Sequence, residues 1–190
     1  TILFIQESLD AHSYALTNGG EGEDSNSTGD LDISSSMTIV GCGVANTIID
    51  GYYSDRILDI QKSTSSPYEV TARGMTMKNG VVVGDFGGIV KNEGSLTLSY
   101  VTIANGSSTG ERGNNKASSS GGGGGGEAGL GGGIYNTGTL YLESNQSGAN
   151  CIISSNAVTG GAGGNGGGNG GQYSGIGGDG GGVDGGVGGN

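Results

Sequence analysis

The feature that most limits the fold is a block of sequence that occurs twice. Residues 87–98 read GGIVKNEGSLTL, and residues 132–142 read GGIYNTGTLYL. Each copy joins a glycine pair to a short apolar strand, a turn and a second, alternating strand. A unit this short cannot bury its own apolar face, so it must stack on further copies. The block therefore predicts an all-β chain built from stacked strand repeats, with no helix.

A second match sets the length of the repeat. Residues 70–80 align with residues 96–106 at a spacing of 26 residues, with apolar residues alternating on both sides of a short step. Alternation is typical of a strand with one buried face, and we interpret the step as a corner. We interpret residues 31–41 as an earlier copy with one extra corner residue. Residues 140–142 and 151–156 are interpreted as a later copy with a longer corner loop.

Three asparagines end what we interpret as equivalent strands: Asn79, Asn105 and Asn156. Asparagine tolerates left-handed backbone and bonds to its own turn, which favours a structural role over a catalytic one. If the three side chains stack, their amides form a ladder along the repeats.

Glycine makes up 47 of the 190 residues, whereas proline occurs once. Collagen is excluded, because it needs a strict three-residue period and much proline. The glycine-rich segments 106–131 and 160–190 are interpreted as insertions at one corner of a single domain, 1–190. Such runs are usually flexible linkers; the alternative is a pack of extended, polyproline-II-like strands, in which only glycine allows close approach. Since the second segment leads into no further repeat, we hypothesise that the chain is a fragment or a processed form.

Charge excludes one class of partner. Seven Lys and Arg against eighteen Asp and Glu give a formal net charge of −11, and no basic residue follows Lys116. Nucleic acid needs a basic track for its phosphates, which this chain lacks. No apolar run is long enough to span a bilayer. Cys42 and Cys151 fall in different repeats and are interpreted as small buried apolar residues rather than as a disulfide.

The repeat resembles that of bacterial surface proteins of the right-handed parallel β-helix class, in particular the polymorphic outer-membrane protein repeats and related adhesin-like proteins. That family pairs a Gly-Gly-Ala/Ile element with an element ending in Asn, matched here by residues 87–90, 132–135 and 153–156. The resemblance covers residues 1–160. It implies a right-handed parallel β-helix, which we expect here with glycine-rich corner insertions. These long insertions depart from the tightest family repeats, although they occupy the expected corner. Because this architecture hosts many functions, it says little about activity.

A rival interpretation is a carbohydrate-active β-helix enzyme, similar to pectin lyases or polygalacturonases. Clustered carboxylates with a basic residue could cleave a polysaccharide, and the candidates are Asp50, Asp55, Arg56 and Asp59. Asp50 and Asp55 lie in turn contexts, where Asp is common for backbone reasons, and Asp55–Arg56 is interpreted as a solvated surface pair. Tyrosines that could stack on a sugar are Tyr52, Tyr53, Tyr68 and Tyr100. Convergence of Asp50, Asp55 and Asp59 on one face would favour the enzyme.

We therefore expect an extracellular or cell-surface structural or adhesive protein rather than an enzyme. No catalytic, cofactor-binding or metal-binding residue is assigned. Calcium in the acidic loop 21–24 is a minor alternative, the lone His12 is expected at the surface, and ice binding is a remote alternative. Expected partners are further copies of the chain, joined end to end into a filament because open strand edges template association, and surface glycans.

Overall fold

A computed structural model describes residues 2–3, 11–20, 22–23, 25–115, 124–145 and 147–165. Within these residues all regular structure is β-strand, and no helix occurs, as the alternating pattern predicts. The chain divides into two compact units. The first comprises Thr1–Val82, Gly87–Ser107 and Gly132–Ala157, and the second Val83–Phe86, Ser108–Gly131 and Val158–Asn190. The prediction of one domain with corner insertions stays a prediction.

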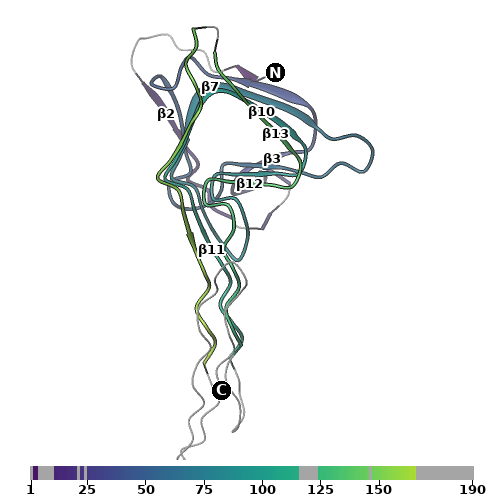
Figure 1. The fold of residues 1–190 in the computed structure, drawn as a ribbon, viewed down its shortest axis with the longest axis vertical. Coiled ribbons are helices and arrows are strands. Elements are labelled where there is room, and N and C mark those ends of the chain that lie inside the picture. Colours follow the sequence, from purple (N-terminus) through teal and green to yellow (C-terminus); the bar gives the residue numbers. More distant parts are fainter. Residues whose placement is uncertain are drawn as a thin grey trace, which may run out of the picture. The chain divides into compact units, whose positions relative to one another are not determined.

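The first unit is organised by parallel sheets. The larger sheet has the order β1-β4-β7-β10-β13, with β5 beside β7, β2 beside β5 and β14 beside β10. Its strands are β1 (Ile2–Leu3), β2 (His12–Ala15), β4 (Met37–Val40), β5 (Thr47–Asp50), β7 (Glu69–Lys78), β10 (Ser95–Ala104), β13 (Thr139–Glu143) and β14 (Ile152–Ser154). Figure 1 shows β7, β10 and β13 running side by side.

Two smaller sheets complete the strand set. One has the order β12-β9-β6-β3, formed by β3 (Leu31–Ile33), β6 (Leu58–Ile60), β9 (Val90–Asn92) and β12 (Ile134–Asn136). The other has the order β15-β11-β8, formed by β8 (Val81–Val83), β11 (Ser107–Thr109) and β15 (Ala157–Thr159). Strands from successive repeats thus pair with each other in parallel, an arrangement compatible with a β-helix.

The strand register confirms the 26-residue repeat. Val70 pairs with Leu96 and Met77 with Ile103, so the whole of residues 70–78 lies against residues 96–104. The step between the two halves of each strand is a corner, where Gly74 has φ +63° and Tyr100 has φ +52°. The later copy is also confirmed, since β13 continues the first half of β10 and β14 the second half.

The interpretation of residues 31–41 is wrong in register. Leu31 pairs with Leu58 in the smaller sheet, and Met37, not Leu31, pairs with Val70. The two apolar stretches of this segment therefore belong to two different sheets. The alternating pattern gave the wrong register because short apolar strands that flank different corners have similar sequences.

Columns of apolar side chains form the core of this unit. One column runs through Ile39, Ala72 and Leu98, and another through Ile49, Met77 and Ile103, and all six are buried. Each residue occupies the inward position of its own strand, so the register that pairs the backbones also stacks the side chains. Burial of one large aliphatic side chain contributes about 1.5–3 kcal/mol, which makes the columns the main stabilising feature of this unit.

The second unit contains three extended segments that we call the glycine pack: residues 110–115, 124–131 and 158–165 (Figure 1). Their backbone N–H groups bond between segments at every third residue: Gly110 to Thr159 O, Gly113 to Ala162 O, Gly161 to Glu127 O and Gly164 to Gly124 O, at 2.7–2.9 Å. A three-residue period is that of a polyproline-II helix. These described parts therefore match the packed alternative rather than a flexible linker, while residues 116–123 and 166–190 lie outside the described residues.

Close approach of the segments explains the glycine. A Cβ atom added at Gly110, Gly126 or Gly161 would lie 1.9–2.0 Å from a backbone oxygen of a neighbouring segment. Real Cβ atoms do not approach that closely, so no other residue fits these positions. The glycine content of the described segments is thus a packing requirement.

Candidate functional site

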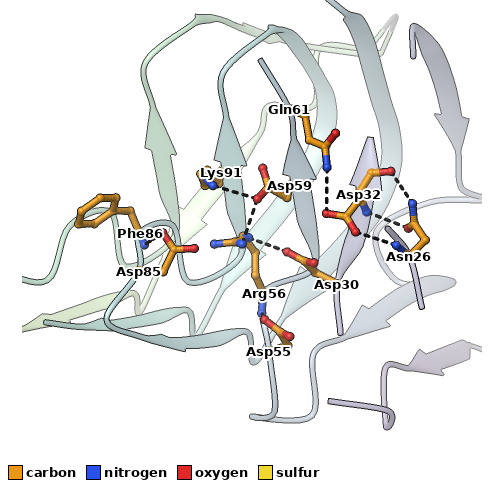
Figure 2. Close-up of polar contacts among 10 residues, drawn as sticks. All are labelled: Asn26, Asp30, Asp32, Asp55, Arg56, Asp59, Gln61, Asp85, Phe86 and Lys91. Atoms are coloured by element: carbon orange, nitrogen blue, oxygen red, sulfur yellow. Dashed lines mark hydrogen bonds and ion pairs between the residues drawn. The ribbon is translucent and has the colours of Figure 1, made fainter. Parts of the chain in front are cut away.

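The residues proposed for catalysis lead to a buried group of charges, which we call the charge network: Asp30, Arg56, Asp59 and Lys91. Arg56 Nε donates to Asp30 Oδ2 at 2.7 Å, and Arg56 Nη2 donates to Asp59 Oδ2 at 3.1 Å. Lys91 Nζ also donates to Asp59 Oδ2, at 3.0 Å. Figure 2 shows the Arg56 guanidinium between the two carboxylates.

The register of the smaller sheet positions the charges of this network. Asp59 on β6 is the direct partner of Lys91 on β9, while its neighbours Leu58 and Ile60 lie in the apolar core. Asp55 and Arg56 precede β6 and are also buried. The interpretation of Asp55–Arg56 as a solvated surface pair is therefore wrong. Its local polar context is that of a turn, but Asp30, a carboxylate that pairs with Arg56, lies 26 positions earlier in the chain.

Two buried carboxylate oxygens in this region, Asp55 Oδ2 and Asp59 Oδ1, have no hydrogen-bond partner among the described residues. Burial raises the pKa of Asp30 to about 6, although Arg56 opposes the shift. A buried carboxylate whose pKa is raised holds a proton at higher pH than an exposed one does. The described residues contain no group of three His, Cys, Asp or Glu side chains arranged to hold a metal ion.

Asp50 belongs to a different cluster. Its carboxylate accepts two hydrogen bonds from Asn79 Nδ2, at 3.0 and 3.1 Å, and pairs with Lys78 Nζ at 3.4 Å. It also accepts the backbone N–H of Tyr52 at 2.9 Å. Thus the structure brings Arg56 and Asp59 together, whereas the side chain of Asp50 is occupied in stabilising a turn.

The four tyrosines considered for sugar stacking are separated. Tyr52 and Tyr53 form an exposed turn, in which both have left-handed backbone with φ +52° and +56°. Tyr68 packs against the apolar core. Tyr100 is half-buried at the strand corner. Tyr52 and Tyr53 are therefore the exposed members of this set, whereas Tyr68 and Tyr100 are both half-buried.

The asparagine ladder is present in part. Asn105 Nδ2 donates to Asn79 Oδ1 at 3.3 Å, and both residues have left-handed backbone. Asn156 is displaced by one position, because Ser154 pairs with Ala104, and its Oδ1 accepts the Gly106 N–H instead. A second ladder was not predicted from the sequence: Asn92 Nδ2 donates to Asn136 Oδ1 at 2.6 Å.

Three smaller predictions can be placed. His12 is exposed on β2, as expected. Among the described residues neither Cys42 nor Cys151 forms a disulfide, but Cys42 is exposed, so its interpretation as buried is wrong. In the acidic loop, Glu21 and Asp24 lie outside the described residues, and the Glu23 carboxylate accepts the backbone N–H groups of Ser27 and Thr28 at 2.8 and 3.0 Å. Those bonds lower the pKa of Glu23, and they tie it to its own loop.

The last described repeat leaves the apolar columns uncovered, and we call this surface, formed by β13 and β14, the open end. Leu98 is 0% exposed, whereas its register partner Leu142 is 53% exposed. Ile103 is 0% exposed, and its partner Ile153 is 47% exposed. Among the described residues no strand pairs with the outer edge of β13 or β14. The columns thus run out to the surface in register.

No helix in the described part of the chain is long and apolar enough to cross a membrane. Comparison of the chain with family models, with curated protein sequences and with solved structures gave no match.

Proposed function

We propose that the chain is a stretch of right-handed parallel β-helix that serves as a structural or adhesive component outside the cell, and that it stacks end to end with further copies. The open end carries this proposal. Leu142 and Ile153 hold the inward positions of their columns, yet they are half exposed. Another repeat added in register would bury them as the inner repeats bury Leu98 and Ile103.

The parallel pairing of successive repeats supports the helical architecture. Connections between parallel strands of one sheet are right-handed in about 98% of cases, which favours the right-handed form. The extracellular location rests on the resemblance of the repeat to bacterial surface proteins. The separation of Asp50 from the charge network supports the structural role over the carbohydrate-active enzyme, because an acid and a base must face the same bond.

An unpaired strand edge offers backbone donors and acceptors as well as apolar surface. The contact would be head to tail, since the open end differs from the β1 and β2 edge, and a head-to-tail contact that does not close on itself propagates into a fibre. The same geometry would let the chain continue into the next repeat of a longer polypeptide.

Electron microscopy and sedimentation velocity over a range of concentrations test the stacking. We expect fibres or growing rods that lengthen with concentration. The variant Ile153→Asp places a charge in the proposed interface and should weaken association at least tenfold. Tyr52→Asp, on an even more exposed residue of an earlier repeat, should have no effect. Single short particles at every concentration, or equal association of the Ile153→Asp protein, would refute stacking.

A further inference from the structure

A groove follows the strand corner across four successive repeats. Val40, Arg73, Ser99 and Glu143 occupy equivalent register positions in β4, β7, β10 and β13, and all four line this groove. Its volume is about 650 Å³, which lies within the range of small-ligand sites. Neighbouring strands are about 4.8 Å apart, so the groove offers a regular row of side chains along the direction in which the repeats stack. We call it the corner groove.

Three glycines leave space in the corner groove because they have no side chain. Gly41, Gly43 and Gly74 line it, and the Gly41 and Gly43 N–H groups bond to the Arg73 and Gly74 carbonyls at 2.9 and 2.8 Å. A Cβ atom at Gly41 would lie 2.2 Å from Gly74 O. Packing therefore requires glycine at position 41, while Gly43 and Gly74 have positive φ angles of +123° and +63°, which glycine adopts without strain.

Tyr100 occupies a corner position at which another repeat has glycine, and its backbone is strained there. It follows Ser99 as Gly74 follows Arg73, so the two residues take the same corner position in adjacent repeats. Both have left-handed backbone, which glycine adopts freely and which costs a bulky residue about 1–2 kcal/mol. The ring is only half-buried, and it lines the groove. Glycine would hold this corner without strain, as at Gly74, yet here the chain places a tyrosine whose half-buried ring is part of the groove lining.

The charges of the groove suit a neutral ligand. Arg73 and Glu143 are exposed and stand two strands apart, with the Ser99 hydroxyl between them. Among the described residues the Arg73 guanidinium makes no ion pair. One positive and one negative group do not select a polyanion, and the net charge of −11 repels one.

We propose that the corner groove binds a neutral linear glycan, with one sugar ring on the Tyr100 side chain and with Arg73, Ser99 and Glu143 bonding to hydroxyl groups. An extended ligand fits a groove that crosses equally spaced repeats, and a ring that offers both an apolar face and hydroxyls matches an aromatic side chain among hydrogen-bonding groups. The proposal rests on the adhesive part of the proposed function. The groove and the open end share β13, but Tyr100 lies on β10 and Ile153 on β14, so separate variants test glycan binding and stacking.

Calorimetry and saturation-transfer NMR should be run with hexasaccharides of cellulose, starch, mannan and chitin, and with polygalacturonate and heparin as polyanions. We expect at least one neutral hexasaccharide to bind, with little dependence on salt. Tyr100→Gly should weaken that binding at least tenfold while keeping the fold, since Gly74 holds the same corner conformation. Tyr52→Gly is the matched control: it also removes a strained, exposed tyrosine, but outside the groove, and should bind normally.

Cys42 gives a second readout, because its exposed thiol lines the groove. The bound hexasaccharide should slow the reaction of Cys42 with N-ethylmaleimide and leave the rate at Cys151 unchanged. The proposal is overturned if no neutral hexasaccharide binds, if Tyr100→Gly binds as the wild type does, or if only polyanions bind. The Ile153→Asp protein should bind the same glycan, which separates failure of the groove from failure of stacking.

Discussion

In the parallel sheets every second residue of a strand fills the core with a side chain, whereas in the glycine pack residues three positions apart must have no side chain. The columns of Ala72, Leu98 and their partners exclude water by apolar volume. The glycine pack does so by direct backbone approach, with N–H groups bonded to carbonyls of neighbouring segments. One chain thus encodes two kinds of packing through the spacing of its residues. Apolar residues at every second position give side-chain packing, and glycine at every third position gives backbone packing.

The largest effect is expected from a methyl group placed inside the glycine pack. In Gly126→Ala the new Cβ would lie 2.0 Å from Gly161 O and 2.4 Å from Gly161 C. Because both contacts are with backbone, the segments must separate, and we expect amide hydrogen exchange to lose protection at Gly110, Gly161 and Gly164. Gly124→Ala, two residues away, meets its nearest atom at 3.3 Å and should leave protection nearly unchanged. Equal behaviour of the two variants would mean that the backbones do not pack this closely.

A smaller effect is expected in the apolar columns, where a side chain can be shortened without forcing strands apart. Leu98→Ala should lower the free energy of unfolding by about 2–5 kcal/mol, since it removes buried methyl groups and leaves a cavity. Leu142→Ala, in the same column at the open end, should cost less than about 1 kcal/mol in the unassociated protein, because Leu142 is already 53% exposed. Chemical denaturation at low protein concentration measures both.

The same pair of variants also bears on stacking. If the cost of Leu142→Ala rises towards that of Leu98→Ala as the protein concentration increases, a second copy covers the open end. A large cost at every concentration would instead show that the chain itself covers Leu142, which would contradict the open end.

The sequence allowed prediction of whatever depends on neighbours at a fixed spacing. The 26-residue repeat placed Val70 on Leu96 because alternation and the Asn-Gly ending recur together. It misplaced Leu31, whose short strand carries no mark of which sheet it joins. It also missed the charge network, because Asp30, Arg56 and Lys91 are far apart in sequence and each has an ordinary polar context. The corner groove cannot be predicted from the sequence either, because the left-handed backbone of Tyr100 is visible only in the fold.

The smallest expected effect is on pH dependence, and it should distinguish the two units. Burial raises the pKa of Asp30 to about 6, from 3.8 in an unfolded chain. The folded state therefore binds this proton more tightly, so its contribution to stability is fully present below pH 3.8 and is lost as the pH rises through 6. We expect the first unit to gain on the order of 1–2 kcal/mol of stability between pH 7 and pH 4.5.

Several charges surround Asp30 and set the size of this effect. Arg56 lowers the pKa of Asp30, while Asp55 and Asp32 raise it. Glu23 acts in the opposite sense: its pKa is lowered, so the stability that its ionised form contributes is lost as the pH falls through that lowered pKa.

Asp30→Asn removes the titrating group and leaves Asp59 to pair with Arg56, so it should flatten the gain between pH 7 and 4.5. Protection from hydrogen exchange in the glycine pack, corrected for the intrinsic pH dependence of exchange, should not change as Asp30 titrates, because the contacts of the glycine pack join backbone groups. An unchanged pH profile in Asp30→Asn would place the raised pKa elsewhere and would leave the charge network a purely structural ion-pair cluster.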